Sequence, residues 1–200
     1  MKWGALGIFV YVGAEVAIGS YLVNYFLDMN LAEAVKSSET MSNISSWVLG
    51  KDLAGVDNKG IVGAFVLFYW SGAMVGRFIG AFLTSIFKPS NILALFSLGA
   101  ISMIVLSMTS SGFLAMWAIL FVGLFNSIMF PTIFTLAIEG LGDYKPQGSG
   151  ILCTAIVGGA FIPPLFGYFS DMGGFKIALI LPIICYLYIA WYGRSRKVSV

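Results

Sequence analysis

The stretch WGALGIFVYVGAEVAIGSYLVNYFLD, residues 3–28, is apolar almost throughout and carries one internal charge, the carboxylate of Glu15. At about 1.5 Å per residue, a helix of this length spans a bilayer with some tilt. Lys2 precedes the run, as a basic residue does in a secretory signal peptide. The apolar region of such a peptide is only about 7–15 residues long, however. The stretch therefore predicts a transmembrane helix rather than a cleaved leader.

The composition of the whole chain is that of an integral membrane protein. Of its 200 residues 59% are hydrophobic and 10% are charged, whereas soluble domains are about half apolar and about a quarter charged. The net charge of +2 includes no long basic tract, so nucleic acid is not an expected partner. The lack of histidine excludes histidine-based catalytic triads and metal sites. Cys153 and Cys185 lack metal-ligand spacing, and no metal is expected.

Six apolar runs are long enough to cross a membrane: about 3–28, 58–87, 91–109, 112–140, 148–170 and 175–193. The first connection, 29–57, is a long polar loop, and the others are short turns that place successive helices side by side and antiparallel. The predicted fold is an all-α membrane protein with a single six-helix domain over residues 1–200. It divides into two inverted three-helix repeats, about 1–110 and about 111–200, whose third helices face the lipid.

Positive charges near the helix ends predict the orientation, because cytoplasmic loops carry an excess of Lys and Arg. With a cytoplasmic N-terminus, the inside charges are Lys2, Lys88, Lys145, Arg194, Arg196 and Lys197, and the outside ones are Lys36, Lys51, Lys59 and Lys176. We therefore expect both termini in the cytoplasm and the loop 29–57 outside it.

Glu15 lies 13 residues beyond Lys2, which corresponds to about 20 Å of helix and places it near the middle of the membrane. A carboxylate at that depth costs at least a few kcal/mol unless it faces water, takes up a proton or finds a partner. We predict that Glu15 lines a cavity as a substrate or proton site, with Tyr11, one turn earlier, as its hydrogen-bonding companion. The alternative is a structural glutamate bonded to a neighbouring helix.

Other helices contribute polar and aromatic candidates for the same site. Asn126 precedes Pro131, which removes a backbone hydrogen bond to Ser127 and breaks the turn. We predict that Asn126 binds substrate hydroxyls, or alternatively makes a hydrogen bond between helices. Tyr69 and Trp70 lie too deep for an interfacial belt. Packing is the preferred explanation of these rings, and stacking on a sugar ring, as members of the substrate site, is the alternative.

Helix 58–87 carries glycines four residues apart, Gly72, Gly76 and Gly80, a spacing that predicts close contact with a second helix. Arg77, beside this stripe, is the second intramembrane charge. A carboxylate partner would lower the cost of burying it, and the predicted partner is Glu139, as a gating latch or as a static pair.

Two further features concern the last helices. Pro163 and Pro164 remove backbone hydrogen bonds within the run 148–170 and predict a point of bending. The segment YLYIAWYG, 186–193, is interpreted as an aromatic anchor at the membrane interface.

Several of these segments together resemble the fucose/proton symporter family of the major facilitator superfamily. They are YVGAEVAIGSYLVNY (11–25), GRFIGAFL (76–83), SIMFPTIFTLAIEGLG (127–142), GSGILCTAIVGGAFIPPLFGYFSD (148–171) and LPIICYLYIAWYG (181–193). The form AEVAIGS (14–20) is most similar to the glucose/galactose transporter branch. The resemblance covers essentially the whole chain but only the C-terminal six helices of a twelve-helix fold.

The resemblance implies half of a secondary active transporter in a bacterial inner membrane. Such a protein imports a monosaccharide, of the glucose/galactose or fucose type, together with protons by alternating access; sodium in place of the proton stays open, and no cofactor is expected. A partner, either the N-terminal half or a second copy, should cover the cavity. A sugar-binding scaffold or sensor, or an inactive fragment, is the alternative. An enzyme is not expected, because the sequence shows no nucleophile paired with a base.

Overall fold

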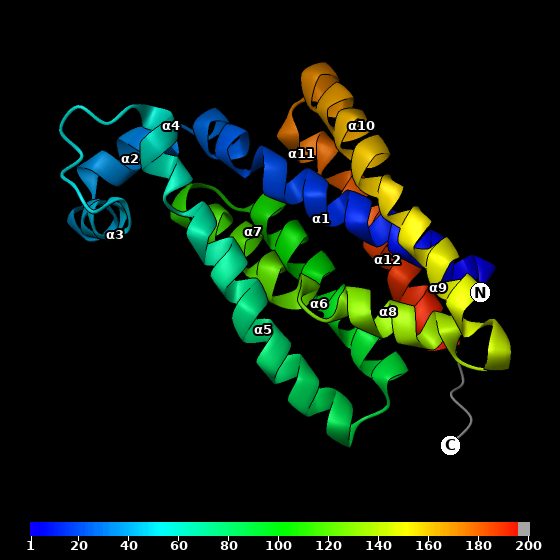
Figure 1. Ribbon diagram of the computed structural model, residues 1–200. Helices are drawn as coiled ribbons and strands as arrows, with labels where there is room; N and C mark the ends of the chain where they lie inside the picture. Colours follow the sequence, from blue (N-terminus) through cyan, green and yellow to red (C-terminus); the bar gives the residue numbers. More distant parts are fainter. Residues whose placement is uncertain (196–200) are drawn as a thin grey trace.

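The computed structural model describes residues 1–195, and within that range it is built from helices and connecting turns, without strands (Figure 1). Arg196 and Lys197, two of the charges used to predict the orientation, lie outside the described residues. Six helical stretches have the length and apolar composition to cross a membrane. They are α1 (Lys2–Asp28); α4 (Asn58–Gly63) with α5 (Val66–Ile86); α6 (Pro89–Thr109); α7 (Gly112–Asn126) with α8 (Met129–Ile138); α9 (Lys145–Thr154) with α10 (Gly158–Gly173); and α11 (Phe175–Ala178) with α12 (Ile180–Ser195).

The prediction of an all-helical protein with six spans is confirmed. The largest difference in the bounds concerns the fifth span, which begins at Gly142 instead of about residue 148, because the short helix η1 (Gly142–Tyr144) precedes α9. The division into two inverted repeats stays a prediction.

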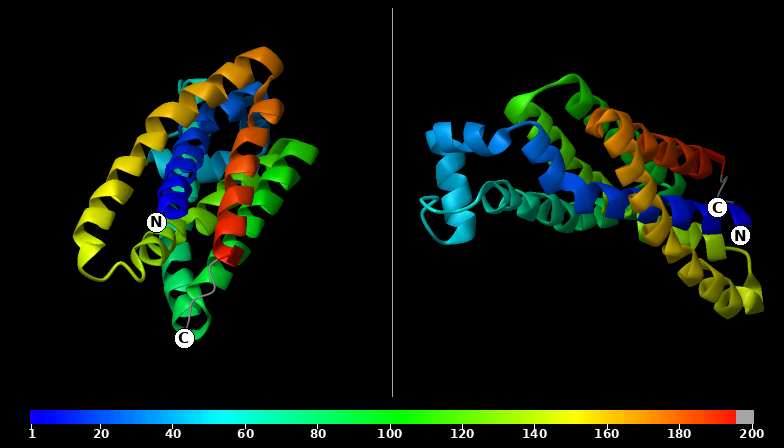
Figure 2. Two further views of the ribbon diagram at one scale, coloured as in Figure 1. Left: turned by 90° about the vertical axis from the view of Figure 1, so that its right-hand side faces the viewer. Right: turned by 90° about the horizontal axis from the view of Figure 1, so that it is seen from above.

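Helix α1 lies at the centre of the bundle. It contacts α10, α12, α8, α4 and α5, and the side chains of Ile8, Ala14, Ala17 and Phe26 are fully buried. Helices α6 and α12 pack against each other behind it, whereas α5, α1 and α10 form the face turned to the viewer in Figure 1 (Figure 2). The third helices of the two predicted repeats, α6 and α12, thus share one side of the molecule, opposite the face on which Glu15 lies.

The spans that carry prolines differ in where their helices are interrupted. Between α7 and α8 the interruption is at Ser127 and Ile128, and Pro131 occupies the first turn of α8, where its missing N–H removes no internal hydrogen bond. Pro163 and Pro164 instead lie inside α10, which continues through both. In that span the interruption is the 3₁₀ turn η2 (Ala155–Val157), which precedes the prolines.

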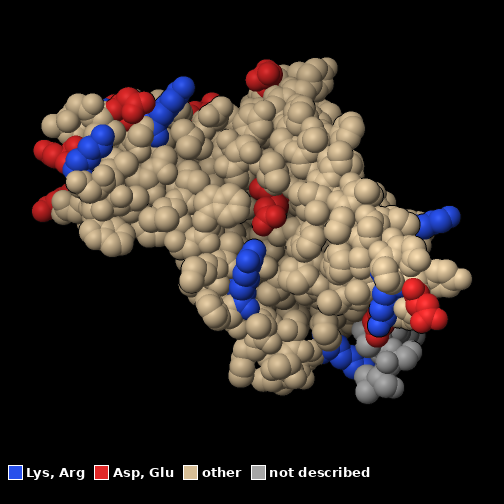
Figure 3. Space-filling view, in the orientation of Figure 1, with Lys and Arg blue, Asp and Glu red and all other residues tan. Residues whose placement is uncertain are grey.

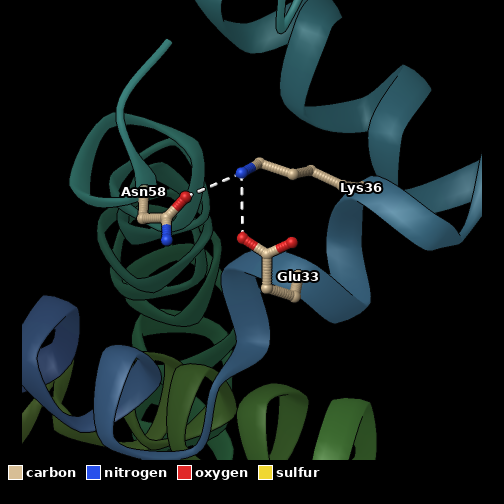
Figure 4. A network of polar contacts seen from close by, with 3 residues as sticks. All are labelled: Glu33, Lys36 and Asn58. Atoms are coloured by element: carbon tan, nitrogen blue, oxygen red, sulfur yellow. Dashed lines mark hydrogen bonds and ion pairs between the residues drawn. The ribbon is translucent and has the colours of Figure 1, made fainter.

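The segment 29–57, predicted as a polar loop, contains two helices that the sequence pattern did not predict, α2 (Leu31–Ser37) and α3 (Glu39–Leu49). Helix α2 forms because Leu31, Ala32 and Val35 share a face that is buried against the end of the bundle. The Lys36 ammonium joins α2 to α4, donating hydrogen bonds to Glu33 Oε1 at 2.9 Å and to Asn58 Oδ1 at 2.8 Å (Figure 4). The hydrogen bond and the charge of Lys36 hold the pKa of the Glu33 carboxyl below its ordinary value.

The glycine stripe of α5 lies against α7 and the interruption that follows it. A Cβ added at Gly72 would meet the backbone of Leu124, one at Gly76 the Leu124 carbonyl oxygen and the Ser127 side chain, and one at Gly80 the side chain of Ile128. Gly123 of α7 completes the contact, since a Cβ there would meet the Tyr69 carbonyl oxygen. Glycines on both helices therefore let the two backbones approach closely.

The Gly76→Ala variant is expected to be less stable by about 1–3 kcal/mol, because the added methyl group overpacks a contact with backbone. Gly72→Ala is the matched control. Its Cβ would lie 3.5 Å from the nearest atom, an ordinary contact, and alanine favours a helix by about 1 kcal/mol over glycine. Denaturation midpoints in mixed micelles measure the difference. Equal effects of the two substitutions would contradict the close α5–α7 contact.

Candidate functional site

Two charged side chains from different helices lie near each other on the face formed by α1, α5 and α10, although no ion pair within 4.0 Å joins them in residues 1–195. Glu15 of α1 is half-buried, Arg77 of α5 is exposed, and the two charges interact electrostatically. Neither helix carries another charge near them: α1 has only Lys2 and Asp28, at its ends, and Arg77 is the one charge of α5. Figure 3 shows an acidic and a basic patch next to each other over α1 and α5, surrounded by uncharged surface.

Arg77 does not pair with Glu139 in this conformation. Among residues 1–195 no ion pair joins them, and Glu139 is exposed at the C-terminal end of α8. The reason is the depth of the two residues. Gly76 and Gly80 of α5 lie opposite Ser127 and Ile128, whereas Glu139 lies about 11 residues beyond Ile128, or about 16 Å along a helix.

Behind Glu15, three tyrosines from three helices surround Asn126 of α7. The Tyr11 hydroxyl donates to the Asn126 backbone carbonyl at 2.8 Å. The side-chain amide donates from Nδ2 to the Tyr69 hydroxyl at 2.8 Å and accepts at Oδ1 from the Tyr186 hydroxyl at 2.7 Å. All four residues are buried. We call this cluster of Tyr11, Tyr69, Asn126 and Tyr186 the asparagine hub.

The hub separates the five predicted sugar-site residues into two groups. Tyr11, Tyr69 and Asn126 are at most 2% exposed and bond to one another. Glu15 and Trp70 reach the surface, and the Trp70 side chain is 52% exposed. The ring of Trp70 packs edge-on against Tyr69, with 5.2 Å between centroids, and lies near Gly19 of α1. In this conformation a ligand can therefore touch Glu15 and Trp70, but not the three hub residues.

Tyr186 is the hub member that the sequence reading missed. The segment 186–193 was interpreted as an interfacial anchor, and Trp191, 50% exposed, is placed as an anchor should be. Tyr186, Ile189 and Tyr192, however, are at most 1% exposed. Their spacing of three residues is the signal that could have identified an inward face of α12.

A cavity of about 370 Å³ adjoins Arg77. It lies between α5, α6 and α8, and its polar lining residues are Arg77, Thr84, Ser127, Thr132 and Thr135, together with apolar ones. Its volume falls within the range of small-molecule sites, about 300–1,000 Å³. No group of three or more His, Cys, Asp or Glu side chains that could hold a metal ion occurs in residues 1–195.

Comparisons with known proteins identify relatives over nearly the whole chain. It is 47% identical over 190 residues to a glucose/galactose transporter of Brucella abortus, an alignment that covers 95% of this chain and 40% of the relative. It is 32% identical over 197 residues to the L-fucose-proton symporter of Escherichia coli, covering 98% of this chain and 40% of the relative. No protein-family model matches the chain.

Among solved structures, the fold is similar to that of the Escherichia coli fucose:proton symporter, FucP. The crystal structure of the major facilitator transporter FucP in the outward conformation superposes with a TM-score of 0.80 at 29% identity, over 99% of this chain and 42% of that one. The chain thus spans about 40% of the length of the curated relatives that it matches. These relatives are named as transporters, in agreement with the expectation that the chain is not an enzyme. The chain is thus similar over nearly its whole length to glucose/galactose transporters and to L-fucose-proton symporters, and it has the fold of one six-helix half of a major facilitator transporter.

Proposed function

We propose that the chain forms the C-terminal half of a secondary active transporter that imports a monosaccharide with protons across a bacterial inner membrane. The similarity to transporters of glucose/galactose and of L-fucose supports the substrate class. The similarity to a fucose-proton symporter supports the proton as coupling ion, with sodium as the alternative. Both termini lie in the cytoplasm, and the segment with α2 and α3 caps the opposite end of the bundle.

The observation that carries this proposal is the opposition of Glu15 and Arg77 on a face without other charges in its centre. A charge at membrane depth is costly and is retained where it faces a partner or a substrate pathway. We assign to Glu15 the role of accepting hydrogen bonds from sugar hydroxyls, to Arg77 that of donating them, and to Trp70 that of stacking on the sugar ring.

The face that carries these residues is incomplete without a partner. Helix α5 exposes Trp70, Met74, Phe78 and Phe82 along its length, each by more than half. The central charges need water or protein around them rather than lipid. We propose that the other six-helix half covers this face and closes the sugar site; a second copy of this chain is the alternative.

Uptake measurements test the proposal. Cells without hexose uptake of their own express the chain alone, or the chain together with the part of the Brucella abortus relative that the chain does not match. We expect accumulation of labelled glucose, galactose or fucose, and a rise in external pH on adding sugar, only with both parts. Accumulation by the chain alone would favour a second copy, and sodium-dependent uptake without proton movement would favour sodium. Sugar binding without accumulation would favour a scaffold or sensor. The absence of both binding and uptake would favour an inactive fragment.

Trp70→Ala is expected to raise the KM for sugar about tenfold with little change in kcat, because it removes a stacking surface worth about 1–1.5 kcal/mol. Trp47→Ala is the matched control: Trp47 of α3 is 76% exposed and lies in the cap, away from Glu15. The concentration dependence of initial uptake rates gives both constants. A KM that is unchanged by Trp70→Ala, or raised equally by both substitutions, would exclude Trp70 from the sugar site.

A further inference from the structure

We propose that Asn126 is a positioning residue for Glu15: through the asparagine hub it fixes the rotation of α1 and α5 so that Glu15 and Arg77 face each other. This inference rests on the role proposed above for Glu15. Asn126 therefore acts on sugar binding indirectly, through Glu15, and does not touch the sugar itself. Its side chain is fully buried, in agreement with such a role.

The hub joins four helices at one residue. Asn126 lies at the C-terminal end of α7, next to the interruption before α8. Its amide uses Nδ2 toward α5 and Oδ1 toward α12, and its backbone carbonyl accepts from α1. An amide that donates on one side and accepts on the other imposes a direction on each partner, which a purely apolar contact does not do.

Two of the hub tyrosines lie on the same helices as the two charges and close to them. Tyr11 precedes Glu15 by four residues, so the two side chains lie one above the other on the same face of α1. Tyr69 precedes Arg77 by eight residues, or about 80° beyond two full helical turns, so the exposed Arg77 lies beside the buried face of α5 that carries Tyr69. Asn126 holds Tyr11 through its backbone carbonyl and Tyr69 through its side-chain amide, and it thereby fixes the rotation of α1 and α5 and the directions in which Glu15 and Arg77 point.

The surroundings of Glu15 agree with this arrangement. The Glu15 carboxyl lies within electrostatic range of Tyr11 on its own helix, of Tyr69 and Arg77 on α5, and of Tyr186 on α12. Arg77 is the one permanently charged group in this set, and the three hydroxyls belong to the hub. A Tyr→Phe substitution in the hub removes a hydroxyl but keeps the aromatic ring. It should therefore loosen the opposition of Glu15 and Arg77 while the apolar packing stays.

Chemical modification of Glu15 tests the inference without relying on transport. Dicyclohexylcarbodiimide, an apolar reagent for protonated carboxyl groups, is applied to membranes that contain the chain with its complementary half, and the modified Glu15 peptide is quantified by mass spectrometry. We expect Tyr11→Phe, Tyr69→Phe and Tyr186→Phe each to raise the rate of modification about threefold, since a hydrogen bond between membrane helices contributes only modestly. Glu15→Gln gives the blank.

Tyr25→Phe is the matched control. Tyr25 is also a buried tyrosine of α1 whose hydroxyl bonds to another helix, here to Ser107 of α6 at 3.1 and 3.2 Å. It lies ten residues beyond Glu15, or about 15 Å along the helix. We expect it to leave the rate unchanged. Equal rates in all variants, or an equal increase with Tyr25→Phe, would overturn the inference. Either result leaves the proposed function standing if Glu15→Gln still lowers sugar uptake.

Discussion

The Asn126→Leu variant is expected to lose about 2–4 kcal/mol of unfolding free energy. Leucine has a similar volume but leaves the Tyr69 and Tyr186 hydroxyls without their partner, and a buried polar group that loses its partner costs about 1–3 kcal/mol. The Tyr11 bond survives, because it uses the backbone carbonyl. In a membrane the unfolded chain also finds partners for polar groups, which favours the lower part of this range. Denaturation in mixed micelles measures the loss.

A rescue experiment separates the loss of hydrogen bonds from a change in shape. Adding Tyr69→Phe and Tyr186→Phe to Asn126→Leu removes the two unpaired hydroxyls, and replacing both partners by apolar groups of similar shape is close to neutral. We therefore expect the triple variant to be more stable than Asn126→Leu alone. A triple variant that is less stable would show that packing around Asn126, rather than the hub, determines the cost.

The span positions were predictable from the sequence because lipid imposes a minimum length on each apolar run. The fold within the membrane follows from those runs and from the short turns. The inward faces were not predictable in the same way. In a soluble helix polar residues mark the outer face, but α1 and α12 are apolar around most of their circumference. On α12 the three-residue spacing of Tyr186, Ile189 and Tyr192 was therefore the one sign of an inward face.

The two members of the candidate site were predictable for a related reason. A charge inside an apolar run is conspicuous, so Glu15 and Arg77 stand out in the sequence. Their partnership was not predictable, because it depends on how α5 slides along its neighbours. The glycine contacts place Arg77 level with Ser127, about three turns from the depth assumed for a pair with Glu139. Asn126 was predicted to bind sugar hydroxyls, but in the structure its side chain bonds to the buried hydroxyls of Tyr69 and Tyr186.

Exchange of charges distinguishes the two possible partners of Arg77. Arg77→Glu places two carboxylates opposite each other at Glu15. An unpaired charge at membrane depth costs about 2.5–3.5 kcal/mol on insertion scales, and each 1.4 kcal/mol corresponds to a factor of ten. We therefore expect sugar uptake to fall by a factor of roughly 50–300. Adding Glu15→Arg restores opposite charges at the same place and should recover at least a tenth of the original uptake, although Glu15 is also proposed to touch the sugar.

The matched control for this rescue is Arg77→Glu combined with Glu139→Arg. It carries the same net charge, but the new arginine lies at the exposed end of α8 and cannot reach residue 77 in this conformation. We expect no recovery. If only the variant with Glu139→Arg recovers, Arg77 and Glu139 form a latch in another state of the transport cycle, and the pair on the open face is incidental to transport. If uptake recovers only in the variant with Glu15→Arg, the carboxylate of Glu15 on α1 is the group that offsets the cost of Arg77 on α5. The two charges then act together at the place where the sugar is proposed to bind.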